Sequence, residues 1–189
     1  LGGGNFIRGS SFSNGVVDRV TSDYMGMLGT VINSLALQSN LKKIGVESRV
    51  MTAISINRVA EPYIKNKASN HLDKNRVVIF ASGTGNPFFS TDTAAVLRAS
   101  EMKSDVILKG TKVDGIYDKD PLDNKDAKKI SEISYSEYLN KEIKVMDATA
   151  ISLAKDSSLP IIIFSILKSS NILDIIEGKG SYSIIKETE

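Results

Sequence analysis

Short apolar runs alternate with segments of helical periodicity along this chain. The runs typical of strands are Val46–Ile54, Arg76–Ala81, Asp105–Leu108 and Pro160–Ile166. The clearest helical segment is Thr21–Ile44, where Met25, Leu28, Ile32 and Leu35 recur at helical spacing. Parallel strands need long crossover connections, and helices usually supply them. The alternation therefore predicts the α/β class with a largely parallel sheet.

The rest of the chain continues this alternation. Helices are expected over Glu61–Asp73, Thr91–Lys103, Tyr135–Ile143, Asp147–Ser157 and Ile172–Glu177. Pro62 suits a first helical turn, and Ser90 or Thr91 suits a helix cap. The polar stretch Lys112–Lys129 is expected to be a surface loop, and Ser181–Lys186 alternates like an edge strand. At 189 residues and 41% hydrophobic content, with no linker or repeat, residues 1–189 are expected to form one domain.

Composition narrows the classes of function. The net charge of +2 gives no large basic field, so nucleic acid is not an expected partner. The sequence has no cysteine and a single histidine, His71, which excludes disulfides and histidine metal clusters. No apolar stretch is long enough to span a membrane, so we expect no membrane partner and a cytoplasmic protein.

The first candidate site is the glycine turn "LGGGNFIRG" at residues 1–9. Glycines let backbone amides approach an anion without side chains in the way. Arg8 follows within reach of the same turn and is always charged. The alternative interpretation, a purely structural tight turn beside a surface arginine, fits the glycines equally well.

The second candidate site is "SGTGNPFFSTD", which follows an apolar strand. Gly83 and Gly85 free the backbone, and a nearby set of hydroxyl and amide groups suits a planar polar ligand: Thr84, Asn86, Ser90 and Thr91. Phe88 and Phe89 are candidate walls for a nucleobase. The full dinucleotide fingerprint needs a third glycine where Phe88 stands. The alternative interpretation places both phenylalanines in the core.

The third candidate site is "ILKGTKVDGIYDKDP", with Lys109 and Lys112 on either side of a glycine. Lysines at a strand end can neutralise the oxygens of a phosphoryl group in transfer. Three carboxylates, Asp114, Asp118 and Asp120, are able to hold magnesium, although residues of this kind in a polar loop are more often solvated. We therefore predict no protein metal site there. The sequence has no P-loop, because "GKGS" at residues 178–181 lacks the preceding glycine.

Together these motifs resemble those of the bacterial uridylate (UMP) kinases, a family with the amino-acid-kinase fold. The resemblance rests on "GGGNFIRG", "DYMGML", "TGNPFFSTD", "LKGTKVDGIYDKDP" and "KVMD", in this order. It implies a three-layer αβα sandwich that transfers the γ-phosphoryl of ATP to UMP, with Mg²⁺, in de novo pyrimidine synthesis. It also implies a cytosolic homohexamer that is activated by GTP and inhibited by UTP.

On the UMP side, the resemblance implies a backbone contact from Gly3 to the UMP phosphate and a ribose contact from Asp23. A carboxylate is a good acceptor for ribose hydroxyls. The loop around the base corresponds to Thr84, Gly85, Asn86, Pro87, Phe88, Phe89, Ser90 and Thr91.

On the ATP side, the resemblance implies phosphate contacts from Gly4 and Arg8, with Arg8 also reaching the transferring phosphoryl group. Further ATP contacts are implied for Thr111, Tyr117 and Asp120. Lys109 is implied as a charge-stabilising catalytic lysine. Asp147 in "KVMD" resembles a buried aspartate of the family that orients such a lysine.

One family feature has no counterpart in these 189 residues. The family begins with a strand and a "K-L-S-G" turn that binds ATP phosphates, and here the sequence starts at the glycine turn. We therefore expect the first strand of the sheet to be absent from this chain. Two alternatives remain open: a carboxylate kinase of the same fold, acting on a substrate such as glutamate or carbamate, and a nucleotide-binding oligomer without catalysis.

Overall fold

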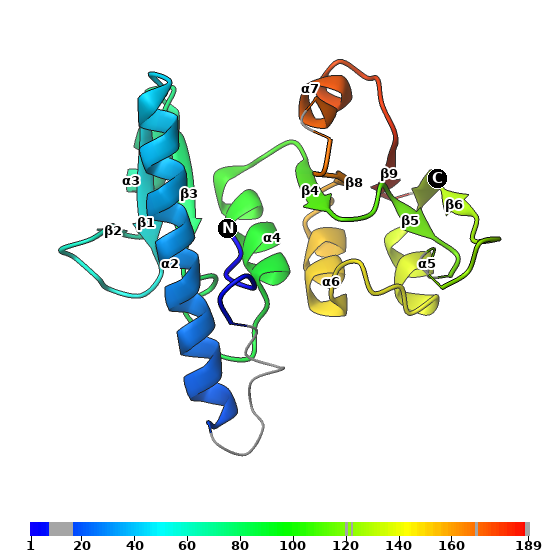
Figure 1. The fold of residues 1–189 in the computed structure, drawn as a ribbon, viewed down its shortest axis with the longest axis horizontal. Coiled ribbons are helices and arrows are strands. Elements are labelled where there is room, and N and C mark those ends of the chain that lie inside the picture. Colours follow the sequence, from blue (N-terminus) through cyan, green and yellow to red (C-terminus); the bar gives the residue numbers. More distant parts are fainter. Residues whose placement is uncertain (8–16, 120, 122, 169, 188–189) are drawn as a thin grey trace. The chain divides into compact units, whose positions relative to one another are not determined.

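The computed structural model describes residues 1–7, 17–119, 121, 123–168 and 170–187 (Figure 1). These residues form two compact units, Leu1–Met102 and Lys103–Glu189. Each unit has its own sheet and helices, and each is described by itself below. A single domain over 1–189 stays a prediction.

The first unit is built on a parallel sheet with the strand order β2-β1-β3. The central strand β1 (Ser48–Thr52) pairs with β3 (Val77–Ala81) and with the short β2 (Glu61–Pro62). The helices are α2 (Arg19–Lys43), α3 (Lys65–Leu72) and α4 (Thr91–Met102). Helix α2 packs on β1 and β3, and the core between them contains Val31, Val50, Ile79 and Ala81. The predicted parallel pairing is confirmed here.

Capping and charged residues near its two ends determine where helix α2 begins and ends. It starts two residues before the predicted Thr21, because the Asp18 side chain accepts a hydrogen bond from the Thr21 amide (3.1 Å) and caps the first turn. Lys42 and Lys43 lie in its last turn, where positive charge favours the helix dipole. Gly45 follows with a φ of +77°, as expected for a helix-ending glycine.

The expected helix Glu61–Asp73 is partly wrong. Glu61 and Pro62 form strand β2, whose Pro62 pairs with Thr52, and helix α3 begins only at Lys65. Proline has no N–H for a sheet, and β2 is the edge of this sheet, where a missing donor is tolerated. The Tyr63 amide then donates to the Thr52 carbonyl (2.9 Å) and continues the pairing with β1.

The second unit contains a mixed sheet with the strand order β4-β8-β9-β7. Strands β4 (Ile107–Thr111) and β8 (Ile161–Ser165) are parallel, and β9 (Tyr182–Ile185) runs antiparallel to β8. The short β7 (Glu132–Ile133) pairs with β9. The helices of this unit are α5 (Tyr135–Asn140), α6 (Ala148–Asp156) and α7 (Asn171–Ile176).

Two sequence-based expectations fail in the second unit. Ser181–Lys186 was expected at a sheet edge, but β9 lies inside the sheet, because β7 covers its other side and Ser183 and Ile185 are buried. The expected loop Lys112–Lys129 contains β5 (Ile116–Tyr117), which pairs with β6 (Lys129–Ile130). Both errors come from two-residue strands, which are too short to leave a periodic signal.

Within the described part of the chain, no helix is both long enough and apolar enough to cross a membrane.

Candidate active site

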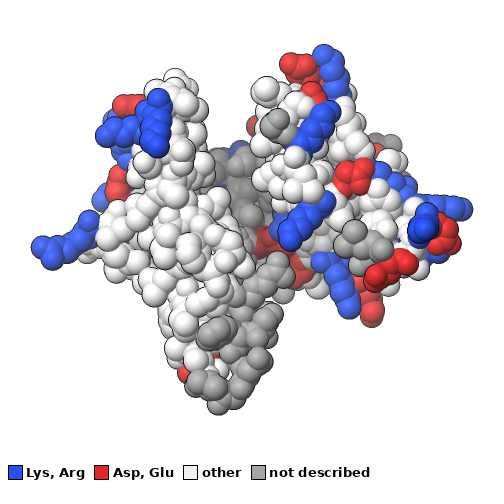
Figure 2. All heavy atoms as spheres, viewed as in Figure 1, with Lys and Arg blue, Asp and Glu red and all other residues white. Residues whose placement is uncertain are grey.

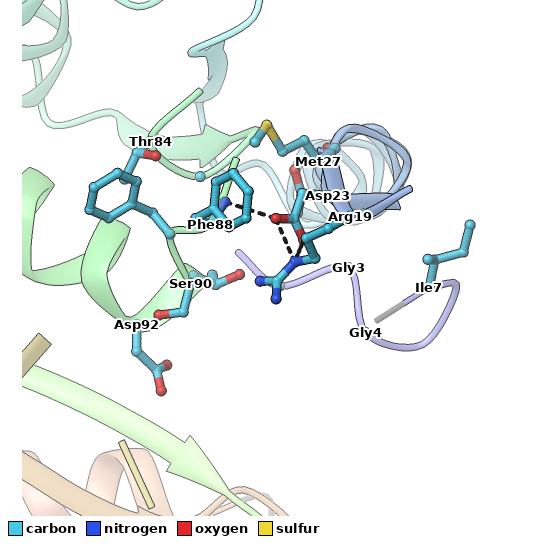
Figure 3. Close-up of a pocket in the computed structure, with 16 residues that line it drawn as sticks. Gly3, Gly4, Ile7, Arg19, Asp23, Met27, Thr84, Phe88, Ser90 and Asp92 are labelled. Carbon is cyan, nitrogen blue, oxygen red and sulfur yellow. Dashed lines mark hydrogen bonds and ion pairs between the residues drawn. The ribbon is translucent and has the colours of Figure 1, made fainter. Parts of the chain in front are cut away.

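A cavity of about 460 Å³ lies in the first unit (Figure 3). Its lining comes from the glycine turn, the N-terminal half of α2, and the loop that joins β3 to α4. It brings together most of the residues predicted to bind UMP: Gly3, Asp23, Thr84, Phe88, Phe89, Ser90 and Thr91, together with Gly4 from the predicted ATP side. Gly85, Asn86 and Pro87 belong to the same loop but do not line the cavity.

The glycine turn is held against α2. The Gly3 carbonyl accepts hydrogen bonds from the amides of Phe6 (3.0 Å) and Ile7 (3.2 Å), which closes the turn. Asn33 of α2 donates to the Gly2 carbonyl (2.8 Å) and to the Asn5 side chain (2.7 Å). A Cβ atom on Gly3 would lie 2.5 Å from the Gly26 carbonyl oxygen and 2.9 Å from the Thr30 nitrogen. Only glycine fits at this position.

Gly3→Ala is expected to destabilise the first unit by roughly 1–3 kcal/mol, because the turn must move away from the α2 backbone. In thermal unfolding this corresponds to a loss of several degrees. Gly2→Ala is the matched control, since a Cβ on Gly2 meets nothing within 4 Å. Equal melting temperatures for the two variants would contradict the close approach.

The loop after β3 is anchored below the cavity. The Ser82 amide donates to the Thr30 hydroxyl (2.6 Å), and the Ser82 hydroxyl bonds to that of Thr52 (2.7 Å). Gly85 has a φ of +82°, and a Cβ there would lie 3.1 Å from the Ala53 Cβ, so its position requires glycine. These contacts tie the loop to β1 and α2, and so fix the floor of the cavity.

Phe88 and Phe89 are side chains of the cavity wall. They are 67% and 53% exposed, and both line the cavity. The alternative that they belong to the core is therefore wrong. Phe88 also has a φ of +71°, a conformation that costs free energy for a bulky residue. Its amide donates to Asp23 Oδ2 at 2.8 Å, which helps to hold this conformation.

Asp23 lies on α2 and contacts the backbone of the same loop. Its carboxylate is 12% exposed and accepts hydrogen bonds from the Phe88 amide and from Arg19 Nε (2.8 and 2.9 Å). Arg19 lines the same cavity but was not among the predicted site residues. The predicted helix begins only at Thr21, so the i, i+4 relation that places Arg19 and Asp23 on one helix face appears only once the structure extends α2 to Arg19.

The N-terminus of α4 opens toward the cavity through Ser90, Thr91 and Asp92. The Thr93 amide donates to the Ser90 hydroxyl at 3.0 Å, which confirms Ser90 as one of the two predicted caps. Backbone amides at a helix N-terminus favour anions, so this end of the cavity suits a phosphate or another anionic group.

The other predicted ATP-side residues lie in the second unit or outside the described residues. Lys109 and Thr111 belong to β4, and Tyr117 belongs to β5. The Thr111 hydroxyl accepts a hydrogen bond from the Val113 amide (2.9 Å), which shapes the turn after β4. Tyr117 lines a second cavity of about 350 Å³ together with Val113, Lys141 and Val145. Arg8 and Asp120 lie outside the described residues.

Asp114 is the centre of a polar network in the second unit. It accepts hydrogen bonds from the Tyr117 hydroxyl (2.7 Å), Lys129 Nζ (2.9 Å) and the Ser181 hydroxyl (3.0 Å). Burial acts to raise the pKa of Asp114, but these hydrogen bonds and the charge of Lys129 outweigh it and lower the pKa to about 2. Asp114 is thus not a simply solvated aspartate, and among the described residues it belongs to no group of three or more acidic side chains.

The low pKa of Asp114 predicts a dependence of stability on pH. Its contribution is fully present above the ordinary value of 3.8 and is lost as the pH falls toward 2. The full shift would correspond to roughly 2.5 kcal/mol, but the side chain is 43% exposed, so we expect about 1 kcal/mol. In urea unfolding, Asp114→Asn should be less stable than the native protein by this amount at pH 6.

The same difference should shrink between pH 4 and pH 2. Asp126→Asn is a matched control, because Asp126 pairs with Lys119 at the surface and is 78% exposed. Its effect should stay within about 0.5 kcal/mol at every pH. An Asp114→Asn effect that is constant from pH 6 to pH 2 would contradict the account.

Asp147 caps helix α6, where its Oδ1 accepts a hydrogen bond from the Ala150 amide at 2.9 Å. Its side chain is only partly buried. Its role in orienting Lys109 stays a prediction.

The described residues contain no group of three or more acidic or histidine side chains that could hold a metal ion.

Comparison with known proteins assigns the class of this chain. The family model described as "Amino acid kinase family" matches residues 1–165. The chain therefore belongs to the amino acid kinase family. This confirms the predicted α/β fold class.

Curated relatives narrow the family to one kind of kinase. A protein of Wolbachia pipientis wMel named "Uridylate kinase" is 56% identical over 187 residues, which cover 99% of this chain and 75% of the relative. A protein of Roseobacter denitrificans with the same name is 52% identical and aligns over 99% of this chain and 77% of its own length. The resemblance to bacterial uridylate kinases is confirmed.

Two solved structures of UMP kinases have the same fold as this chain. The crystal structure of UMP kinase from Ureaplasma parvum matches with a TM-score of 0.94 and 39% identity, over 99% of this chain and 80% of that chain. The structure of UMP kinase from Bacillus anthracis matches with a TM-score of 0.95 and 42% identity, over 100% of this chain and 78% of that chain.

Proposed function

We propose that this protein is a UMP kinase, which transfers the γ-phosphoryl group of ATP to UMP and forms UDP and ADP. The observation that carries the proposal is the cavity of the first unit, where Asp23, Phe88 and the backbone of the glycine turn face one space. A nucleotide has a ribose, a base and a phosphate. The cavity offers a carboxylate acceptor for the ribose, an aromatic wall for the base and backbone amide donors for the phosphate. The relatives named uridylate kinase support the same substrate.

Each part of UMP has a proposed partner. The ribose hydroxyls donate to Asp23, and the base lies in the loop from Thr84 to Thr91, beside Phe88 and Phe89. Gly85, Asn86 and Pro87 shape this loop. The phosphate is bound by the backbone at Gly3, in a turn where only glycine fits.

The ATP side rests on the resemblance to the family. Gly4 and Arg8 are proposed to contact the ATP phosphates, and Thr111, Tyr117 and Asp120 the rest of ATP. Arg8 and Lys109 are proposed as the catalytic cations. A phosphate oxygen of UMP attacks the γ-phosphorus in line, and it is already ionised, so no general base is required. Mg²⁺ would enter with ATP and neutralise charge on the phosphates.

Two observations favour this proposal over the alternatives. A carboxylate kinase acting on glutamate or carbamate needs neither an aromatic wall nor a ribose acceptor, and the cavity has both. A nucleotide-binding oligomer without catalysis would not require catalytic cations, and the chain contains Lys109 and Arg8, for which the resemblance implies that role.

The experiment is a coupled assay of ADP release with MgATP and each of UMP, CMP and glutamate. UMP is expected to give the highest kcat/KM. A site that pairs with O4 and N3–H of uracil leaves polar groups unpaired against cytosine, and such a mismatch can cost several kcal/mol. Comparable kcat/KM for UMP and CMP would contradict uridine specificity. Turnover with glutamate instead of UMP would support the carboxylate kinase.

A self-associating surface is proposed on α2. Val20, Tyr24, Leu28 and Ile32 recur every four residues and are 39%, 42%, 48% and 53% exposed. Figure 2 shows that the surface over the middle of this helix is almost free of charged side chains. An uncharged apolar ridge of this kind suits packing against a second copy.

We propose that this surface contributes to a homohexamer in the cytoplasm. Light scattering at working concentration should give a mass of six chains, and a monomer would contradict it. Activation by GTP, inhibition by UTP and a role in de novo pyrimidine synthesis are proposed from the resemblance. Adding GTP or UTP to the assay checks the activation and the inhibition.

A further inference from the structure

Arg19 and Asp23 form an ion pair that faces the cavity rather than the outer surface. Arg19 Nε donates to both carboxylate oxygens of Asp23, at 2.9 and 2.8 Å. The Asp23 side chain is 12% exposed and that of Arg19 is 41% exposed. In Figure 3 the guanidinium tip of Arg19 points away from Asp23 into the cavity. Among the described residues that line this cavity, Arg19 is the only one with a positively charged side chain.

Phe88 connects the same pair to the base loop. Its amide donates to Asp23 Oδ2 at 2.8 Å, and the guanidinium carbon of Arg19 lies 5.5 Å from the centre of its ring. The ring is thus within reach of a cation–π contact. Phe88 is held at a φ of +71°, which is unfavourable unless its surroundings impose it. Arg19, Asp23 and Phe88 therefore support one another.

These contacts restrict Asp23 without using up its capacity to accept. A carboxylate has about four acceptor positions. Arg19 Nε contacts both oxygens and the Phe88 amide contacts Oδ2, so Oδ1 has fewer donors and keeps an acceptor position for a ribose hydroxyl. A carboxylate fixed in this way needs no reorganisation when a diol arrives, and such preorganisation is a source of both affinity and specificity.

We propose that Arg19 is a positioning residue for ribose recognition: it holds Asp23 and the Phe88 segment so that the carboxylate reads the 2′ and 3′ hydroxyls of the nucleotide. This inference rests on the proposed function, because it takes UMP as the occupant of the cavity. It adds a selectivity to that function, which is discrimination against the 2′-deoxy nucleotide.

A purely structural role for Arg19 would have a different signature. Partly exposed i, i+4 ion pairs contribute little to stability, so removing Arg19 should change the melting temperature only slightly. A role in holding the fold would lower stability and weaken all ligands equally. A positioning role changes the ratio of affinities for UMP and dUMP. These ligands differ only in the 2′ hydroxyl, which is one of the two hydroxyls that Asp23 is proposed to read.

The experiment measures UMP and dUMP binding by titration calorimetry, together with turnover of UMP, in the full natural protein. The native protein should bind UMP about tenfold more tightly than dUMP. Arg19→Met keeps an unbranched apolar side chain and removes the charge, and it should reduce this ratio to about twofold, mainly through weaker UMP binding. Arg19→Lys should recover part of the ratio, since a lysine four residues away can still reach the carboxylate.

Arg58→Met is the matched control, because Arg58 is an exposed arginine of the same unit that does not line this cavity. It should keep the native ratio. In the double variant with Asp23→Asn, Arg19→Met should add little, since both changes remove the same function. Equal weakening of UMP and dUMP by Arg19→Met would overturn the proposal; with an unchanged melting temperature it would indicate a contact to the phosphate, and with a lowered one a role in holding the fold.

Two further outcomes separate this inference from the proposed function. A native protein that turns over UMP but binds UMP and dUMP equally would overturn the inference and leave the kinase assignment intact. A native protein that neither binds nor turns over UMP would overturn both.

Discussion

Replacing Lys109 by methionine is expected to lower the kcat of UMP phosphorylation about a hundredfold or more, with a much smaller change in the KM for UMP. Lys109 is the third residue of β4, and its side chain is partly exposed. During phosphoryl transfer, negative charge develops on the equatorial and leaving oxygens, and a fixed cation there is worth most in the transition state. Methionine keeps an unbranched apolar side chain and removes the ammonium group with its charge and its donors.

The measurement is steady-state kinetics with saturating MgATP, together with a melting curve to show that the variant is folded. Lys125→Met serves as the control, because Lys125 is an exposed lysine of the same unit that lines neither cavity. The control should keep native kcat. Native kcat in Lys109→Met would show that Lys109 is not at the transferring phosphoryl group.

Asp23→Asn is expected to weaken UMP binding by about ten- to a hundredfold and to leave ATP binding nearly unchanged. A hydrogen bond to a charged group contributes roughly 1.5–3 kcal/mol, and each 1.4 kcal/mol corresponds to tenfold in affinity. The Asp23 carboxylate is 12% exposed and also anchors the Phe88 amide. The amide of asparagine has one acceptor oxygen, so it cannot keep Arg19, Phe88 and the ribose together.

Calorimetric titration of each nucleotide tests this prediction. Asp73→Asn is the control, since Asp73 is an exposed carboxylate at the end of α3 and outside the cavity. Its affinity for UMP should equal that of the native protein. A similar loss for UMP and ATP in Asp23→Asn would count against its place at the ribose.

The sequence indicated the elements whose signal is local. The apolar spacing of three and four residues and Gly45 located α2, the short apolar runs located β3 and β8, and the motif after β3 located the cavity loop. The same motif left the burial of Phe88 and Phe89 open, because an aromatic pair in a turn suits a core and a binding wall equally well. Only their exposure in the folded chain decides between these two readings.

Features that depend on distant residues were not predictable in this way. The two-residue strands β2 and β7 form because they pair with β1 and β9, and nothing in their own residues indicates a strand. The Asp114 network joins residues that are up to 67 positions apart, so its low pKa has no sequence signature. Arg19 was missed for another reason: the predicted helix begins at Thr21, so its i, i+4 relation to Asp23 was not visible before the structure placed Arg19 in the first turn of α2.

The fate of the phosphoryl group tests the central claim most directly. Incubation of the full natural protein with UMP and ATP labelled at the γ-phosphorus should place the label on the β-phosphorus of UDP, with one UDP formed for each ADP. Asp23→Asn at low UMP should slow the appearance of labelled UDP in proportion to its weaker binding. ADP release without labelled UDP, or label found only in inorganic phosphate, would contradict the assignment of this protein as a UMP kinase.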